Sequence, residues 1–222
     1  MSKANKKLSK EELKEDRFVE WAMSAAEFVR KNSQLVIAAG IFVVIVILSI
    51  NFILSSQREA RVEASALLGD AIVADGNRQA DEVIRLCELL IAEYAGTPAA
   101  AQGTLLLANR YFALGRFADA QRLYQSYLDD YEPLDVLVFA AWSGVAACLE
   151  AEGEFQHAAK LYQKYAEDHA GTMQASLALF EAARCFGSVG DVANQKEILV
   201  RITKDFPESP VARRAQDLAG ML

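Results

Sequence analysis

The sequence predicts an all-α protein, with a single transmembrane helix at residues 34–56 followed by an α-solenoid of three to four helical hairpins at residues 57–222. Two observations predict this fold class. The first is an apolar run from Leu35 to Leu54 that contains no charged residue. The second is a pair of turn landmarks that recur along the remaining chain with one shared period, which is typical of stacked helical repeats.

Residues 1–33 form a polar lead that precedes the apolar run. The stretch Ser9-Lys10-Glu11-Glu12 matches a capping box, and from Leu13 to Val29 apolar residues recur at helical spacing. These features predict an amphipathic helix on the cytoplasmic side of the membrane. Two interpretations stay open: an interfacial or docking helix, or a solvated lead without a partner.

The apolar run predicts a membrane anchor. Between Lys31 and Arg58 lie 26 uncharged residues. As a helix they extend about 39 Å, which exceeds the ~30 Å hydrocarbon core of a bilayer. A buried core helix with this uniform apolar surface would need protein on every side. A cleavable signal peptide would need a shorter run and a small-residue cleavage site, so an uncleaved anchor is favoured.

Charge predicts how the anchor is oriented and which partners are excluded. Eight Lys and Arg residues precede the run, but only Arg58 and Arg61 follow closely. The basic side usually stays in the cytoplasm, so the N-terminus is expected inside and the repeat domain outside. Residues 58–222 hold 15 basic and 24 acidic residues, a net charge of −9. Nucleic acid is therefore not an expected partner.

Two landmarks define the repeat period. One follows each expected second helix, and its steps are 37, 38 and 37 residues. The other is a glycine turn inside a unit, with steps of 38 and 37 residues. Because the two sets agree, they predict helix–turn–helix units. The first set is Tyr94, Tyr131, His169 and Phe206, and the second is Gly115, Gly153 and Gly190.

The period divides the domain into units near residues 62–98, 101–135, 139–172 and 176–209, with a capping helix at 210–222. The first unit is degenerate, and Gly76 as its turn residue implies two extra residues in that turn. Ser209 is the expected N-cap of the capping helix.

These units resemble the tetratricopeptide repeat. The unit from Ala101 has Tyr111, Gly115, Phe117 and Ala120 at the family's positions. The next unit matches through Trp142, Gly153, Phe155 and Ala158, and small residues at 108, 146 and 183 are expected to let paired helices approach closely. The family usually has alanine where Tyr127 and Tyr165 stand, so longer second helices or longer inter-unit turns are expected.

The resemblance implies that the first helix of each unit lines a concave groove for an extended peptide or a partner helix. Ordinary solvent exposure of the same residues is the open alternative. A clamp for a terminal carboxylate does not fit, because Leu105, Gly144 and Glu181 replace its polar residues. The groove residues carried over from the family are Gln102, Leu105, Leu106, Asn109, Ala140, Ser143, Ala147, Glu150, Leu177, Phe180, Glu181 and Arg184.

The sequence contains no recognisable catalytic or metal-binding motif, so no enzyme activity, cofactor or metal is expected. His157 and His169 are twelve residues apart, on a polar helix face and in a turn. Cys87, Cys148 and Cys185 fall within apolar helical patterns and are expected as buried thiols. A Cys148–Cys185 disulfide stays open as an alternative for an oxidising compartment.

In layout the chain resembles the YfgM-type ancillary subunits of the bacterial Sec translocon. That resemblance implies a single-pass protein of the inner membrane, with a periplasmic repeat domain that binds translocon subunits, a periplasmic chaperone or exported polypeptides. The membrane lipid would be contacted through one helix. Two alternatives stay open: a scaffold for outer-membrane or peptidoglycan assembly, since residues 206–210 resemble repeats of such proteins, and a small-molecule enzyme or binding domain.

Overall fold

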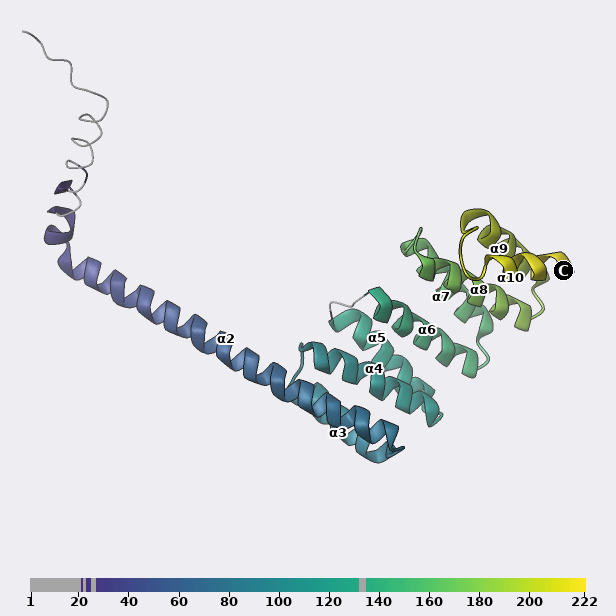
Figure 1. Ribbon diagram of the computed structural model, residues 1–222, viewed down its shortest axis with the longest axis horizontal. Coiled ribbons are helices and arrows are strands. Elements are labelled where there is room, and N and C mark those ends of the chain that lie inside the picture. The colour runs from purple at the N-terminus through teal and green to yellow at the C-terminus, as the bar shows by residue number, and fades with distance from the viewer. Residues whose placement is uncertain (1–20, 22, 25–26, 132–134) are drawn as a thin grey trace, which may run out of the picture. The chain divides into compact units, whose positions relative to one another are not determined.

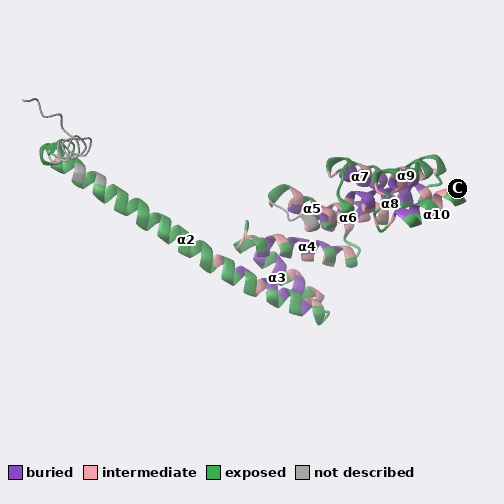
Figure 2. Ribbon diagram, turned by 45° about the horizontal axis from the view of Figure 1, so that its top comes forward, coloured by how far each residue is buried: buried purple, intermediate pink, exposed green. Residues whose placement is uncertain are grey.

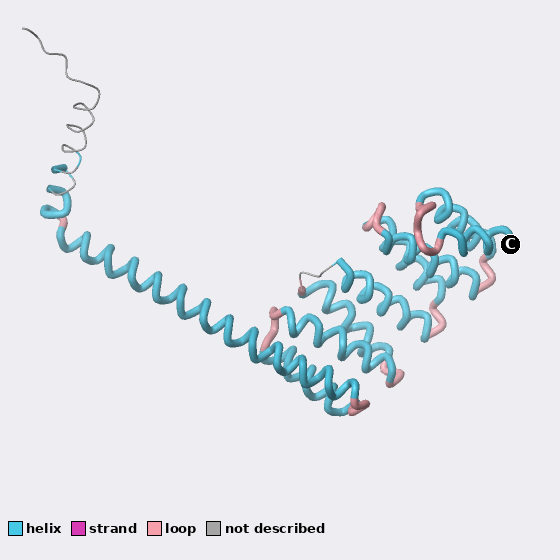
Figure 3. The backbone as a smooth tube through the Cα atoms, viewed as in Figure 1, coloured by secondary structure: helices cyan, strands magenta, loops and turns pink. Residues whose placement is uncertain are grey.

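A computed structural model describes residues 21, 23–24, 27–131 and 135–222. The chain divides into two compact units, Met1–Arg58 and Glu59–Leu222. Every regular element given for the described residues is an α-helix, and short loops join the helices of the second unit (Figures 1 and 3). The all-α class is therefore confirmed. The predicted amphipathic lead, with its cap at Ser9, lies mainly outside the described residues.

Helix α2 (Ser33–Gly76) contains the apolar run and is 44 residues long. By length and composition it is the one helix in the described part of the chain that is able to cross a membrane. The described apolar side chains of this helix before Arg58 are exposed, and Figure 2 colours most of this stretch as exposed. Phe42 and Phe52 are among the exposed side chains. The helix continues without a break past the predicted end of the span at residue 56, and its last turns belong to the first repeat.

Four helical hairpins and a final helix make up the second unit. Each second helix has 14 residues, and each hairpin turn has three. The first helices of the second, third and fourth hairpins have 16 or 17 residues, and three links of four residues join the four hairpins. These lengths add up to the period of 37–38 residues. The helices are α3 (Ala80–Glu93), α4 (Pro98–Ala113), α5 (Phe117–Asp130), α6 (Asp135–Ala151), α7 (Phe155–Asp168), α8 (Met173–Ser188), α9 (Val192–Asp205) and α10 (Ala212–Met221).

The turn of the first hairpin differs from the prediction. It spans residues 77–79, as short as the other hairpin turns, so the two expected extra residues do not exist. Arg78 has a φ of 59°, and the corresponding turn residue Gly115 has a φ of 76°. Gly76 is instead the last residue of α2. The prediction was wrong because a glycine was taken as the turn marker, whereas an arginine holds the left-handed conformation.

The core between successive helices combines alanines with large aromatic rings. Ala108, Ala146 and Ala183 are at most 1% exposed, as expected for positions where paired helices approach closely. Tyr165, which replaces the family's usual alanine, is 2% exposed and stacks on His169 with ring centroids 4.1 Å apart. Its ring centroid also lies 5.0 Å from that of Phe139 on α6. These large second-helix residues therefore fill the space between units.

The last helix covers the C-terminal end of the stack. Helix α10 packs on α9. Its residue Ala215 is fully buried in the hydrophobic core of this end of the domain. The prediction that Ser209 caps this helix is wrong, because Val211 occupies the N-cap without a side-chain hydrogen bond. The Ser209 hydroxyl is buried without a partner among the described residues, and its backbone carbonyl accepts from the Ala212 N–H at 3.1 Å. A backbone turn thus starts α10.

Candidate protein-binding groove

A cavity of about 290 Å³ lies between α2, α4, α5 and α6 in the second unit. All four groove residues predicted on α4 line it, together with Ala140 from α6. Leu68 and Ile72 come from the last turns of α2, which the sequence did not suggest as groove residues. We call this the concave cavity. Its lining residues are Leu68, Ile72, Gln102, Leu105, Leu106, Asn109, Tyr124, Leu137 and Ala140.

The concave cavity has an apolar lining and a polar margin. Leu105 is 8% exposed and Leu106 is half-buried, whereas Gln102 and Asn109 are exposed. The Tyr124 hydroxyl donates to Asn109 Oδ1 at 2.5 Å. In the described structure no hydrogen bond uses the NH₂ group of Asn109, so this group is available to a partner's carbonyl.

Tyr124 is a fixed part of this wall. Burial raises the pKa of Tyr124 to about 12, and the nearby thiol of Cys148 contributes to the increase. The phenol therefore stays protonated at neutral pH and keeps donating to Asn109. A sequence pattern gives no sign of this hydrogen bond, because it joins residues on two helices, α4 and α5.

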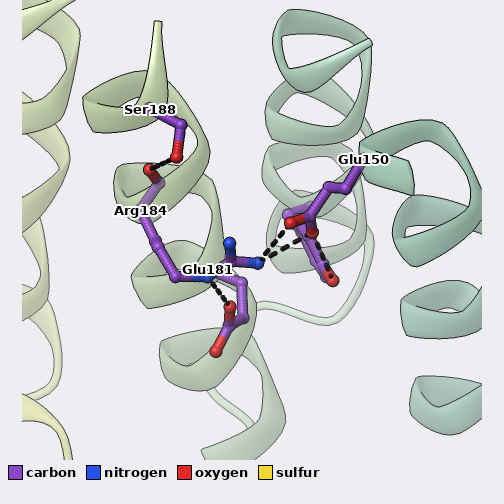
Figure 4. Close-up of polar contacts among 5 residues, drawn as sticks. Glu150, Glu181, Arg184 and Ser188 are labelled. Carbon is purple, nitrogen blue, oxygen red and sulfur yellow. Dashed lines mark hydrogen bonds and ion pairs between the residues drawn. The ribbon is translucent and has the colours of Figure 1, made fainter. Parts of the chain in front are cut away.

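Arg184 on α8 binds two carboxylates, Glu150 on α6 and Glu181 on its own helix, so it links α8 to α6 through Glu150 (Figure 4). Its Nη2 lies 2.8 and 2.6 Å from the two carboxylate oxygens of Glu150, and its Nε lies 2.6 Å from Glu181 Oε2. Burial lowers the pKa of Arg184, but hydrogen bonds and charge from Glu181 and Glu150 outweigh burial and raise the pKa. These predicted groove residues therefore bind one another, and their charges are satisfied within the protein.

A second hollow of about 320 Å³ lies between α8, α9 and α10. Phe180 lines it but is only 7% exposed, because it packs in the hydrophobic core of this part of the domain. The Arg214 guanidinium of α10 lies 4.9 Å from its ring centroid. The sequence predicted both the capping helix and Phe180 as a groove residue, but not the contact between them. The predicted groove residues on α4 and Phe180 on α8 therefore line two separate hollows.

The remaining predicted groove residues lie outside both hollows. Ser143, Ala147 and Leu177 are half-buried and do not line either one. The Ser143 hydroxyl is buried and has no hydrogen-bond partner in the described structure. Among the groove residues predicted from the sequence, only the four on α4 and Ala140 on α6 therefore lie together on one accessible surface.

The cysteines are buried in the repeat domain, whereas His157 lies on its surface. Cys87, Cys148 and Cys185 are free and buried, which confirms the prediction of buried thiols. Burial raises the pKa of Cys185 to about 12, with a further contribution from Glu150. The structure places no disulfide between Cys148 and Cys185. His157 is exposed and lies 2.8 Å from Glu154 Oε2.

No group of three or more metal-ligating side chains gathers anywhere in the described residues.

Stacked helical hairpins with a hollow on their first helices define an α-solenoid of the kind that binds other proteins. More particularly, residues 26–136 match the family model of the tetratricopeptide repeat-like domain, and the chain belongs to this family. The predicted repeat class is confirmed. This fold is typically a non-enzymatic protein-interaction module.

Solved structures support the same fold. Two structures of a Podosopora anserina putative kinesin light chain with nearly identical TPR-like repeats, one of them a single-residue variant, are similar to this chain. The variant has a TM-score of 0.54 and 18% identity, over 72% of this chain and 77% of that one. The other has a TM-score of 0.53 and 19% identity, over 72% and 85%. No curated protein matches the sequence.

Proposed function

We propose that this protein is a membrane-anchored scaffold that binds segments of other proteins in the concave cavity. The observation that supports this most strongly is that the groove residues expected from the repeat family on α4 line one cavity with residues of α2 and α6. Such grooves bind extended peptides or helices through apolar anchors and a few polar contacts.

The lining of the concave cavity indicates the chemistry of the partner. Leu105, Leu106 and Leu137 favour one large apolar side chain, because burying its surface is worth about 1.5–3 kcal/mol. At the margin, the NH₂ group of Asn109 and the exposed amide of Gln102 suit a backbone carbonyl of the same segment.

Helix α2 supports the membrane part of the proposal. The described apolar residues of α2 before Arg58 are exposed, and so many exposed apolar side chains in succession are typical of a segment that lies in lipid. The excess of Lys and Arg before the helix favours a cytoplasmic N-terminus. In a bacterium with two membranes, the repeat domain then faces the periplasm.

The layout of lead, anchor and repeats favours an ancillary subunit of the Sec translocon, which links it to periplasmic chaperones or exported chains. An assembly scaffold for the outer membrane or peptidoglycan shares the same architecture. The two proposals differ in their partners, so identification of the captured proteins separates them.

Photocrosslinking in intact cells tests the proposal. A photoreactive residue replaces Gln102 at the cavity margin, and a matched variant replaces Gln156, which is exposed on α7 and does not line the cavity. A third variant replaces Phe42 in the apolar part of α2.

We expect the residue at position 102, but not the one at 156, to crosslink to exported chains or a chaperone. The residue at position 42 should crosslink to translocon subunits. Capture of envelope-assembly proteins alone would replace the translocon role with the assembly role. Equal capture from 102 and 156, or none from 102, would overturn the concave cavity as the binding surface.

A further inference from the structure

Asn51 is the only amide side chain within the apolar run from Leu35 to Leu54. It is exposed, and its Nδ2 donates to the backbone carbonyl of Ile47 at 2.9 Å. Its Oδ1 accepts no hydrogen bond within the described part of the chain. If α2 spans a membrane, as the proposed function states, this oxygen lies at a depth where lipid offers no donor.

The helix itself has no donor to give to Asn51 Oδ1. Inside an α-helix every backbone N–H already donates to the carbonyl four residues earlier, so only carbonyls remain for side chains to share. Ser49 differs, because a hydroxyl can donate to such a carbonyl in its own helix. Leaving a polar atom unpaired in an apolar medium costs about 1–3 kcal/mol by protein measurements. Asn51 therefore favours a donor from another helix.

Asn51 lies on a regular face of α2. Gly40, Val44, Ile47, Asn51 and Leu54 are spaced by four, three, four and three residues, which is the heptad spacing of two helices that pack side by side. Asn51 is seven residues after Val44 and therefore occupies the same heptad position. A single asparagine at such a position of a helix–helix interface determines how many helices associate and in which register. At Gly40, a side chain would meet nothing within 4 Å in this structure, and its absence lets another helix approach closely.

We propose that this face, the Asn51 seam, binds the same face of a second copy of the chain in the membrane. All copies insert with one orientation, so two parallel helices bring their Asn51 side chains to the same depth. An amide has both donor and acceptor groups, so each Asn51 donates to the Oδ1 of the other. A different partner would need a matching polar group at that depth, whereas a second copy always has its own Asn51 there.

The test uses the full chain in phosphatidylcholine vesicles, with donor or acceptor fluorophores at the C-terminus. Energy transfer measured over a range of protein-to-lipid ratios gives the dimer dissociation constant in the membrane. The variants are Asn51→Leu and Ser49→Leu. Position 49 is a matched control, since two residues amount to a rotation of roughly 200° and place it on the opposite side of the helix.

We expect the wild type to dimerise, Asn51→Leu to dimerise about 3- to 30-fold more weakly, and Ser49→Leu to match the wild type. A monomeric wild type, or equal dimerisation of wild type and Asn51→Leu, would overturn the Asn51 seam. Vesicle flotation after carbonate extraction shows whether the protein is anchored in the membrane, and so distinguishes loss of dimerisation from loss of the membrane anchor. Protein that does not float has no anchor, whereas protein that floats as a monomer contradicts only the seam.

Discussion

Gly144 in α6 lies directly against the ring of Tyr124 from the preceding hairpin. A Cβ atom at Gly144 would lie 2.5 Å from two carbon atoms of that ring, closer than real Cβ contacts allow. The ring is 5% exposed and its hydroxyl donates to Asn109, so it has little room to move. The absence of a side chain at Gly144 is therefore required for α5 and α6 to pack and for one wall of the concave cavity to form.

Gly144→Ala is expected to lower the free energy of unfolding by about 1–3 kcal/mol, the usual cost of overpacking a core. Gly187→Ala is the control. Its nearest neighbour is the amide end of the flexible Gln195 side chain, so its stability should stay within about 1 kcal/mol of the wild type. Urea denaturation followed by circular dichroism measures both. Equal losses in the two variants would contradict this account of Gly144.

The buried thiols predict how stability depends on pH. Burial raises the pKa of Cys87 and Cys148 to about 11 and that of Cys185 to about 12. In the unfolded chain these thiols ionise near pH ~8.5. Above that pH the unfolded state binds fewer protons than the folded state, so stability falls as pH rises toward 11–12.

Urea midpoints measured from pH 8 to pH 10.5 check this expectation. The midpoint should decrease over that range, and Cys185→Ala should show a shallower decrease because it removes one of the three buried thiols whose pKa is raised. The same pH dependence in both proteins would show that Cys185 does not contribute through its ionisation.

At the scale of elements, the hairpin turns show how far sequence reasoning reached. Gly115, Gly153 and Gly190 gave the correct period because a left-handed residue ends each first helix there, and glycine adopts that conformation without steric cost. The position of the first hairpin turn was not predicted correctly. Its left-handed residue is Arg78, whose identity gives no local signal, and the nearby Gly76 is helical.

Substitutions in the turns test this assignment. Arg78→Gly should raise stability by about 0.5–1 kcal/mol, because it removes the strain of a side chain at positive φ. Gly115→Ala should lower stability by about 1 kcal/mol for the opposite reason.

Gly76→Ala is the discriminating variant, because a helical glycine with open space around it should gain from alanine. Denaturant midpoints compare the three variants. A loss of stability in Gly76→Ala would contradict its placement in α2.

At the scale of the whole repeat domain, the concave cavity was predictable only in part. The residues of α4 and Ala140 follow from the repeat register, since each unit places the same positions on the same helix face. The separation of Phe180 and Arg184 from that surface depends on contacts between distant parts of the chain. Arg214 lies over Phe180, and Glu150 pairs with Arg184 across 34 residues. No local pattern encodes such pairs.

The central claim is that the concave cavity is the surface that binds partner proteins. Quantitative mass spectrometry of proteins that co-purify with the full chain from membranes tests it most directly. Leu106→Lys places a charge in the cavity, and Leu114→Lys places the same charge on an exposed leucine that does not line it. We predict that Leu106→Lys loses most of the partners that position 102 crosslinks, and that Leu114→Lys retains them. Retention of the same partners by both variants would contradict the claim.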